Sequence, residues 1–331
     1  MNVLLDYHHL SLLRSLYILF RERFQFNVDI PSGWDWYYEG SLYSSYAPEV
    51  GAYTISPEFN NAYFHRYLPD LKPGAYEKFK DNHYDIVVCT LLENYVAWKT
   101  LVRQYNLKAK VIFQIGNNIP LWCQPTQFEN IMSSSWPCYV NYPCKNKVFY
   151  HQEFDTKLFK QNVDCNRKSV GNLQHFMQMP ELFYGLEKSM TDYTFHSHGA
   201  GNRDGFIPNG EHEMSDFIKN IGFLFHCKVV DEGYGHNIHN AFACGKPVIT
   251  DSSHMGVDWN GWIGNTASLL FEDGKTIIDV NGKTIKEVEG AIRDMTDNYA
   301  EVSNYVLKKF QTVSDFDDEF LAIKSFLSNL V

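Results

Sequence analysis

The segment between residues 228 and 250 has the residue types and spacing of a phosphate-binding turn. A lysine at a predicted strand end precedes a loop with two glycines that opens a predicted helix; the residues are Lys228, Gly233, Tyr234, Gly235 and His236. The first N–H groups of a helix have no acceptor within it and form the positive end of its dipole. The amides of Gly235 and His236 therefore suit a diphosphate, and Lys228 could neutralise its charge. The alternatives are an ordinary turn and a solvated lysine.

Two polar side chains near this loop could recognise a sugar. Glu232 lies at the mouth of the loop, where its carboxylate could accept hydrogen bonds from sugar hydroxyls; the alternative is a residue that only caps the helix dipole. Asn240 follows eight residues later, about two helical turns on, where its amide could reach a ribose hydroxyl. We expect its neighbour His239 to be packed in the protein rather than to bind a ligand.

The stretch resembles the nucleotide-sugar signature of retaining glycosyltransferases with the GT-B fold. That signature reads Glu-Gly-aromatic-Gly, then a second Glu, then Ala-x-Ala-x-Gly-x-Pro-Val. The matching residues are Glu232, Gly233, Tyr234, Gly235, Ala241, Ala243, Gly245, Pro247 and Val248. Asn240 replaces the second Glu, which in the family holds the donor ribose. The resemblance implies that Glu232 contacts the donor sugar and that the loop and Asn240 bind a nucleotide-sugar donor, with a UDP-sugar favoured.

Gly-His after the aromatic residue, and His-Asn before Ala241, are more specifically similar to a group of bacteriophage glycosyltransferase-like proteins. The similarity extends to residues 9–23, to the region of Trp36 and to residues 151–155. Phages of this kind glycosylate hydroxymethylated cytosines in their own DNA. The resemblance therefore implies duplex DNA containing 5-hydroxymethylcytosine as the acceptor. Trp36 belongs to an aromatic cluster, which is either core or interface, or a platform on which acceptor bases stack.

Polar residues that directly follow predicted strands are the other candidates. In the first half these are Asp6, His8, His9 and Asn117. Ligands of α/β proteins bind at the carboxyl ends of parallel strands. We therefore interpret His8 and His9 as groups that activate the acceptor oxygen, with His9 favoured, and Asp6 and Asn117 as acceptor-binding; core histidines and a helix-capping Asp6 are the alternatives.

Arg203 is a further candidate for donor binding. It lies in a glycine-containing loop after a predicted strand, a usual place for a second phosphate contact. The alternative is an ion pair with its neighbour Asp204. Pairs such as His226-Cys227 and His196/His198 have no second pair at zinc-site spacing, and Asp315-Phe316-Asp317 looks structural, so no metal is expected.

Strand-like apolar runs alternate with helical patterns in both halves of the chain, which predicts parallel βαβ units. The clearest unit has a strand at 86–90, a helix at 93–105 and a strand at 110–114. The second half is predicted to contain a helix at 182–190 and strands at 193–198, 222–226 and 247–250, with a short strand at 269–271. The resemblance implies the arrangement: an α/β GT-B protein with two Rossmann-like doubly wound domains facing across a cleft, and C-terminal helices.

The expected domains are an acceptor-binding domain at residues 1–160 and a nucleotide-sugar-binding domain at 161–313. Residues 314–331 are expected to form a last helix that packs back toward the first domain, with Ser314 and Asp317 as a capping box. The polar and poorly periodic stretch 155–173 is interpreted as the interdomain linker.

Composition excludes several classes of protein. The 331 residues are 44% hydrophobic and 21% charged, without a low-complexity tract, so the chain is globular. No apolar run is long enough to span a membrane, and no signal peptide is evident, which predicts a cytoplasmic protein, in the infected host if phage-encoded. Seven cysteines without paired spacing predict reduced thiols. Residues 1–160 hold 15 basic and 15 acidic residues, and residues 161–331 hold 14 and 24, so a polyanion would prefer the first half.

The preferred hypothesis is a retaining glycosyltransferase that moves a sugar from a nucleoside diphosphate to 5-hydroxymethylcytosine in phage DNA. It needs no resident cofactor, because cations and a helix end supply the positive potential. Two alternatives stay open: a glycosyltransferase for a cell-surface polysaccharide, and a non-catalytic nucleotide-binding module. The oligomeric state and the identity of the sugar are left undetermined.

Overall fold

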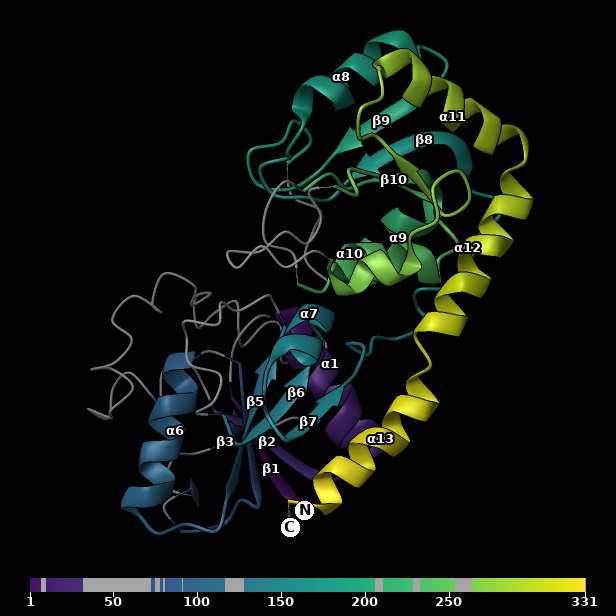
Figure 1. Ribbon diagram of the computed structural model, residues 1–331. Helices are drawn as coiled ribbons and strands as arrows, with labels where there is room; N and C mark the ends of the chain where they lie inside the picture. The colour runs from purple at the N-terminus through teal and green to yellow at the C-terminus, as the bar shows by residue number, and fades with distance from the viewer. Residues whose placement is uncertain are drawn as a thin grey trace. The chain divides into compact units, whose positions relative to one another are not determined.

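The structure is a computed structural model, and it describes residues 1–6, 10–31, 73–74, 78–79, 81–90, 92–116, 128–205, 211–228, 233–253 and 264–330. The chain divides into two compact units. Unit 1 comprises Met1–Ser134, Cys138–Phe154 and Phe316–Val331, and unit 2 comprises Ser135–Pro137 and Asp155–Asp315. The division therefore falls at residues 154 and 155, six residues before the expected boundary, and the last helix belongs to unit 1 (Figure 1).

Unit 1 contains a seven-stranded sheet in which every pair of neighbouring strands is parallel. Its order is β3 (Pro73–Gly74), β2 (Asn27–Pro31), β1 (Asn2–Leu5), β4 (Ile86–Cys89), β5 (Lys110–Ile115), β6 (Asn130–Ser133) and β7 (Asn146–Phe149). The helices are α1 (Leu10–Tyr17), which continues as the π-helical η1 (Ile18–Arg23), α6 (Leu92–Gln104), α7 (Trp136–Asn141) and α13 (Phe316–Ser328); the first two residues of α7 fall in unit 2. Strands β1 and β4 are almost wholly buried, as expected for a parallel sheet covered by helices.

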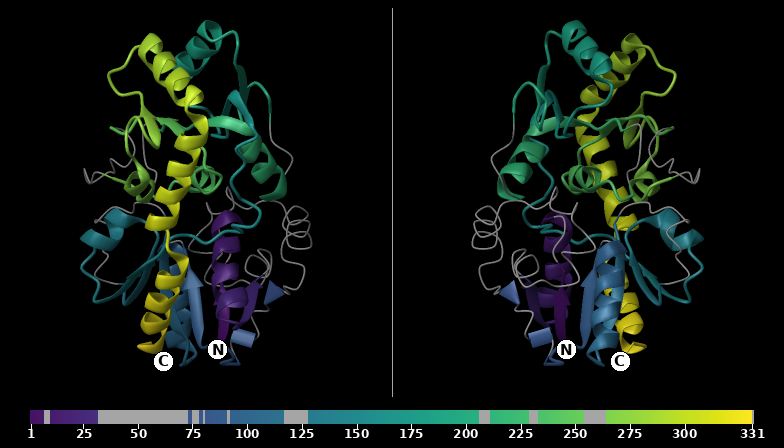
Figure 2. Two further views of the ribbon diagram at one scale, coloured as in Figure 1. Left: turned by 90° about the vertical axis from the view of Figure 1, so that its right-hand side faces the viewer. Right: turned by 90° about the vertical axis from the view of Figure 1, so that its left-hand side faces the viewer.

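Helix α13 packs on the core of unit 1 with side chains from its last two turns. Ile323, Phe326 and Leu327 join the cluster that contains Val3 and Leu5 of β1, and the Phe320 ring lies 4.3 Å from that of Phe24 between centroids. Figure 2 shows this yellow helix beside the purple and blue elements of the same unit. The apolar face of the last helix therefore contributes to holding it on unit 1.

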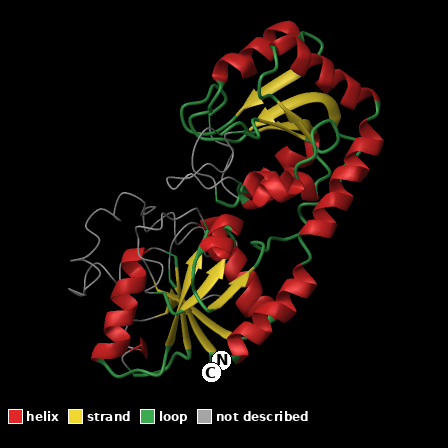
Figure 3. Cartoon of the chain, in the orientation of Figure 1, coloured by secondary structure: helices red, strands yellow, loops and turns green. Residues whose placement is uncertain are grey.

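Unit 2 contains a five-stranded sheet, again parallel throughout (Figure 3). Its order is β12 (Ile277–Asp279), β11 (Val248–Thr250), β10 (Ile221–Phe225), β8 (Asn166–Asn172) and β9 (Thr194–Ser197). The helices are α8 (Pro180–Ser189), α9 (Glu211–Asn220), α10 (His236–Ala243), the 3₁₀ turn η5 (Thr266–Leu270), α11 (Ile285–Asp297) and α12 (Tyr299–Val313). Helices α8 and α11 lie on one side of the sheet and α9 and α10 on the other (Figure 1).

The prediction of two parallel α/β sheets is confirmed, but three local predictions are wrong. The supposed linker 155–173 contains β8, whose first residues are polar and exposed while Ser169–Asn172 is buried. Residues 269–271 end a 3₁₀ turn, and the strand that follows is β12. The Ser314 hydroxyl is buried without a hydrogen-bond partner among the described residues, so Ser314 does not cap α13.

Two general predictions can be compared with the described residues. Six of the seven cysteines are described, and each is a buried free thiol: Cys89, Cys138, Cys144, Cys165, Cys227 and Cys244. Across the described helices, none has the length and hydropathy that crossing a membrane requires.

Helix α11 begins with a complete capping box, which provides a test of local stability. The Thr284 side chain accepts a hydrogen bond from Glu287 N–H, and the Glu287 carboxylate accepts one from Thr284 N–H at 2.7 Å. Thr284→Ala is expected to lower the free energy of unfolding by about 1 kcal/mol, because an N-terminal N–H loses its acceptor. Urea unfolding measures this. Thr312→Ala, at an exposed position of α12, is the control and should be neutral; equal effects of the two substitutions would contradict the capping role.

Candidate functional site

The segment Gly233–Gly235 forms a tight turn at the start of α10 in unit 2. Thr266 donates to the Gly233 carbonyl from its N–H at 3.1 Å and from its hydroxyl at 3.2 Å, and Ala267 N–H donates to the Tyr234 carbonyl at 3.1 Å. The Gly235 carbonyl accepts from the N–H groups of Ile238 and His239. The carbonyls of the turn are therefore taken up by η5 and by α10, and the first N–H groups of α10 have no acceptor within the helix itself.

Gly235 is required by the backbone at this turn. It is the N-cap of α10 with φ 83° and ψ 53°, in the left-handed region that side chains other than glycine avoid. A Cβ placed on it would lie 2.7 Å from Ala267 Cβ. The turn thus depends on glycine both for its conformation and for its contact with η5.

Tyr234 contributes to the turn as a packed side chain. It is buried, and its ring stacks on the His239 ring with centroids 4.1 Å apart and planes at 6°. His239 is fully buried, and its Nδ1 lies 2.9 Å from the Gly235 carbonyl oxygen. His239 therefore has the packed position expected for it, and any contact of Tyr234 with a donor would come through its backbone.

Asn240 offers a buried acceptor at the second turn of α10. Its Nδ2 approaches Met214 Sδ of α9 at 3.9 Å, and its Oδ1 has no hydrogen-bond partner among the described residues. A buried amide oxygen normally accepts a hydrogen bond. Because no described residue donates one to Asn240 Oδ1, this oxygen is available to a water or to a ligand hydroxyl. The amide oxygen could accept a hydrogen bond from one ribose hydroxyl, whereas the two oxygens of the Glu that Asn240 replaces could accept from more than one.

The two cations predicted to bind the donor differ in their surroundings. Lys228 lies half-buried just beyond β10, at the carboxyl end of a central strand. Arg203 donates to Glu187 at 2.9 and 3.0 Å and to Asp204 at 3.1 Å, and these carboxylates raise its pKa. The ion pair with Asp204, given above as the alternative for Arg203, is thus present. Its guanidinium is already neutralised, which disfavours Arg203 as a phosphate contact.

Other buried polar atoms at the carboxyl ends of the unit 2 strands were missed by the sequence analysis. Within the described residues, those without a hydrogen-bond partner include both amide atoms of Gln174, the hydroxyls of Ser197 and Thr250, and Nδ2 of Asn265. Gln174, Ser197 and Thr250 follow or end β8, β9 and β11. Their positions at strand ends were the available signal. Doubly wound sheets bind ligands at this edge, so these atoms belong to the candidate site.

The carboxyl edge of the unit 1 sheet carries a second group of buried polar residues. Asp6, directly after β1, is 2% exposed, and its carboxylate accepts from Trp98 Nε1 at 3.1 Å. The hydroxyl of Ser134 accepts from Gln114 Nε2 at 3.3 Å and from Gln152 Nε2 at 2.8 Å. Oε1 of Gln114 has no partner among the described residues. This edge therefore carries buried amide and carboxylate groups that are largely bonded to one another and to neighbouring side chains.

Five of the predicted site residues lie outside the described residues. They are Glu232, His8, His9, Asn117 and Trp36. The described part of the prediction comprises Lys228, Arg203, Gly233, Tyr234, Gly235, His236 and Asn240 in unit 2, and Asp6 in unit 1. The structure brings the loop residues and Asn240 together on α10 and at its start.

Comparisons with known proteins bear on the fold. No protein-family model matches the chain, and a search of curated proteins gives no match. Among solved structures, HepE from Anabaena in complex with UDP-glucose has a TM-score of 0.66 at 12% identity, covering 99% of this chain and 100% of that one. Sucrose-phosphate synthase from Thermosynechococcus elongatus has a TM-score of 0.65 at 11% identity, covering 100% and 99%.

A third solved structure is an alpha-glucosyltransferase in complex with UDP and a 13-mer DNA containing a HMU base. Its TM-score is 0.62 at 10% identity, and 99% of each chain is covered. At identities this low the likeness concerns the fold. The chain therefore has the two-domain α/β fold of the GT-B glycosyltransferases.

Proposed function

We propose that this protein is a glycosyltransferase that transfers a sugar from a nucleoside diphosphate donor, with a UDP-sugar favoured. The observation that carries the proposal is the Gly233–Gly235 turn at the start of α10, together with Oδ1 of Asn240 on the same helix, which no described residue donates to. Three similar solved structures contain UDP or UDP-glucose, which supports this donor.

The barrier to glycosyl transfer is the charge that develops on the leaving diphosphate and on the sugar ring. In our proposal the amides at the start of α10 and the Lys228 ammonium stabilise the diphosphate, because preorganised dipoles and charges favour the transition state. Oδ1 of Asn240 accepts a hydrogen bond from a ribose hydroxyl. Glu232, assigned from its sequence position, orients the sugar, and retention of configuration follows the family resemblance.

Duplex DNA containing 5-hydroxymethylcytosine is our proposed acceptor. A solved structure of the same fold holds UDP together with DNA that contains a HMU base, and its likeness extends over 99% of this chain. The balanced charge of residues 1–160 is compatible with a polyanion near unit 1. A carbohydrate acceptor is the second candidate, favoured by the likeness to sucrose-phosphate synthase.

Mass spectrometry of the products separates these candidates. Purified protein is incubated with a panel of UDP-sugars and duplex DNA that contains 5-hydroxymethylcytosine, with Glu232→Ala as the inactive control. A hexose- or pentose-sized mass gain on the base, absent with Glu232→Ala, would establish the DNA acceptor. Donor hydrolysis without DNA modification would favour a carbohydrate acceptor, and no turnover of any donor would contradict the enzyme.

Removal of the Asn240 amide is expected to weaken UDP binding about tenfold. Loss of one hydrogen bond to a ribose hydroxyl costs about 1–1.5 kcal/mol, which corresponds to roughly a factor of ten in Kd. Asn240→Ala is compared by calorimetric titration with Asn304→Ala, an exposed asparagine on α12. The titration is repeated with 2′,3′-dideoxy-UDP, which lacks both ribose hydroxyls. If Asn240→Ala weakens binding of this analogue tenfold as well, the amide does not contact a ribose hydroxyl.

A further inference from the structure

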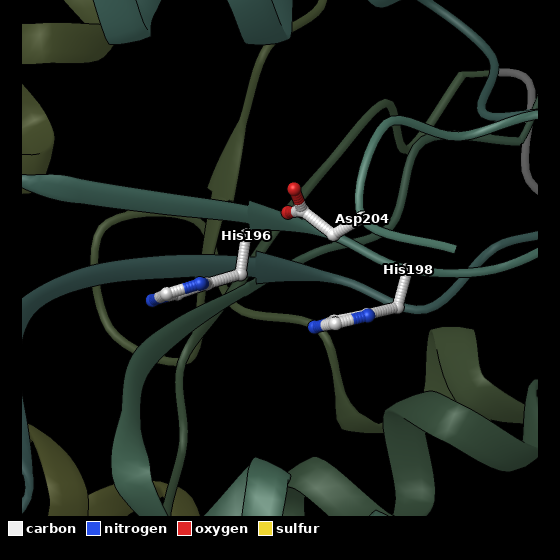
Figure 4. A group of neighbouring side chains, drawn as sticks. All are labelled: His196, His198 and Asp204. Atoms are coloured by element: carbon white, nitrogen blue, oxygen red, sulfur yellow. The ribbon is translucent and has the colours of Figure 1, made fainter. Parts of the chain in front are cut away.

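Two histidines lie on the same side of the edge strand of the unit 2 sheet. β9 is the last strand in the order, and a single residue, Ser197, separates His196 from His198, so their side chains share one face of the extended chain. His198 N–H donates to Asn172 O at 2.9 Å and so continues the ladder with β8. Figure 4 shows both imidazole rings on this side of the strand.

The loop after β9 returns along the free edge of the strand and places a carboxylate beside the two rings. Asp204 N–H donates to Ser197 O at 2.9 Å, and Ser197 N–H donates to Asp204 Oδ2 at 2.7 Å. These two bonds occupy the Ser197 groups that face away from β8 and fix Asp204 next to the strand. As a result, ligand atoms of His196, His198 and Asp204 all lie within 4.8 Å of one another.

Phe217 of α9 holds the imidazoles in place. Its ring meets the His198 ring edge-on at 5.0 Å and the His196 ring at 6.2 Å, with interplanar angles of 87° and 86°. Gly171 of β8 pairs with His196 in the sheet, and a Cβ there would lie 2.6 Å from Phe217 Cζ. The glycine therefore makes room for the ring that orients both histidines.

The atoms needed for coordination are available in this cluster. His198 Nδ1 is buried and has no hydrogen-bond partner among the described residues. Each Asp204 oxygen accepts one N–H bond, from Ser197 and from Arg203, and keeps a second lone pair. Arg203 also pairs with Glu187, which offsets its positive charge near the site.

We propose that His196, His198 and Asp204 form a divalent transition-metal site, with Zn²⁺ as its ion. Two imidazoles and one carboxylate suit Zn²⁺, Co²⁺ or Ni²⁺, whereas Mg²⁺ and Ca²⁺ prefer oxygen ligands. The remaining coordination positions face solvent, since His196 and Asp204 are exposed. The ion fastens the loop 199–205 to the edge of the sheet. The spacing in the sequence did not reveal this site, because Asp204 joins the histidines only through the return of the loop.

Metal titration of the full chain tests the proposal. Co²⁺ binding is followed by visible absorption and Zn²⁺ binding by competition with a chelating dye, for the wild type, His196→Ala and Asp204→Asn. We expect both substitutions to weaken binding at this site by at least roughly tenfold, since even partners outside the coordination shell cost 10- to 100-fold. Zn²⁺ should also raise the thermal midpoint of the wild type but not of Asp204→Asn.

The control is His83→Ala, which removes an exposed histidine of unit 1 that contacts the Tyr84 ring. It should bind both metals as the wild type does. The proposal is overturned if His196→Ala and Asp204→Asn bind Zn²⁺ as tightly as His83→Ala, or if the wild type binds neither metal below about 100 µM. Circular dichroism without metal shows whether each variant is folded, and Asp204→Asn is the closest replacement in size and shape.

Discussion

Gly235→Ala is expected to lower the free energy of unfolding of unit 2 by about 2–4 kcal/mol and to reduce glycosyl transfer at least tenfold. The left-handed conformation at φ 83° costs a non-glycine residue about 1 kcal/mol, and overlap in a packed site adds about 1–3 kcal/mol. The new Cβ would lie 2.7 Å from Ala267 Cβ. Relief of that overlap must shift the turn or η5, and with it the amides that we assign to the diphosphate.

A matched glycine separates strain from overlap. Gly274 has φ 75°, and a Cβ on it would meet nothing within 4 Å, so Gly274→Ala measures the conformational cost alone. In Gly235→Ala/Ala267→Gly the opposing methyl is absent, and part of the lost stability should return. Urea unfolding and the transfer assay are run on all three variants. Equal losses for Gly235→Ala and Gly274→Ala, with no recovery in the double variant, would refute the packing argument.

Strands that are wholly buried consist of apolar residues, and the sequence predicts them well. Strands whose side chains are polar and exposed are defined by backbone hydrogen bonds alone, and the sequence does not reveal them. β4 is entirely buried and was predicted at its position. β8 begins with Asn166, Arg167 and Lys168, which are exposed, so its polar pattern was interpreted as a linker. Its parallel partners β9 and β10 hold it in the sheet regardless of these side chains. Pairing between distant strands is invisible to a local pattern.

The candidate site was predictable in its contiguous part only. Residues 233–240 form one turn and one helix, so their spacing in the sequence is also their spacing in the structure. Gln174 follows β8 and Thr250 ends β11, and neither belongs to a local motif, yet both have buried atoms without a hydrogen-bond partner in the described part of the chain. Asp204 meets His196 only because the loop folds back. Side chains that become neighbours only when a loop folds back can be recognised as a site only once the fold is known.

A buried ion pair fixes the start of α13 on unit 1. Arg23 donates to Glu153 Oε1 at 3.0 Å, to the Phe316 carbonyl at 2.7 Å and to Asp317 Oδ1 at 2.6 Å. Its guanidinium also lies over the Phe320 ring, 4.8 Å from the centroid. The Glu153 side chain is 7% exposed and that of Asp317 is 95% exposed. If the Arg23 cation is removed, the buried Glu153 carboxylate therefore loses more stabilisation than the exposed carboxylate of Asp317.

Glu153 has a pKa that depends strongly on its surroundings. Burial raises the pKa of Glu153 from 4.5 to about 7; Arg23 opposes the rise, and the carboxylates of Glu319 and Asp317 add to it. Between these two pH values the folded chain holds a proton that the unfolded chain has released. Stability from this group is complete below pH 4.5 and is lost as the pH rises through about 7.

Arg23→Met is expected to destabilise unit 1 by about 3 kcal/mol at pH 8 and by much less at pH 5. At pH 8 the substitution leaves a buried carboxylate without its cation, whereas at pH 5 Glu153 is neutral and needs none. Urea unfolding at both pH values measures this. In Arg23→Met/Glu153→Gln both charges are absent, so the extra loss at pH 8 should vanish.

The wild type itself carries the same pH dependence, and Glu153→Gln isolates it. Glutamine keeps the shape of the protonated side chain and cannot ionise. The difference in unfolding free energy between the wild type and Glu153→Gln should therefore change by about 3 kcal/mol between pH 5 and pH 8, with the wild type losing stability as the pH rises. If the unfolding free energies of the two proteins change in parallel over this pH range, Glu153 titrates normally in the folded chain and the raised pKa is refuted.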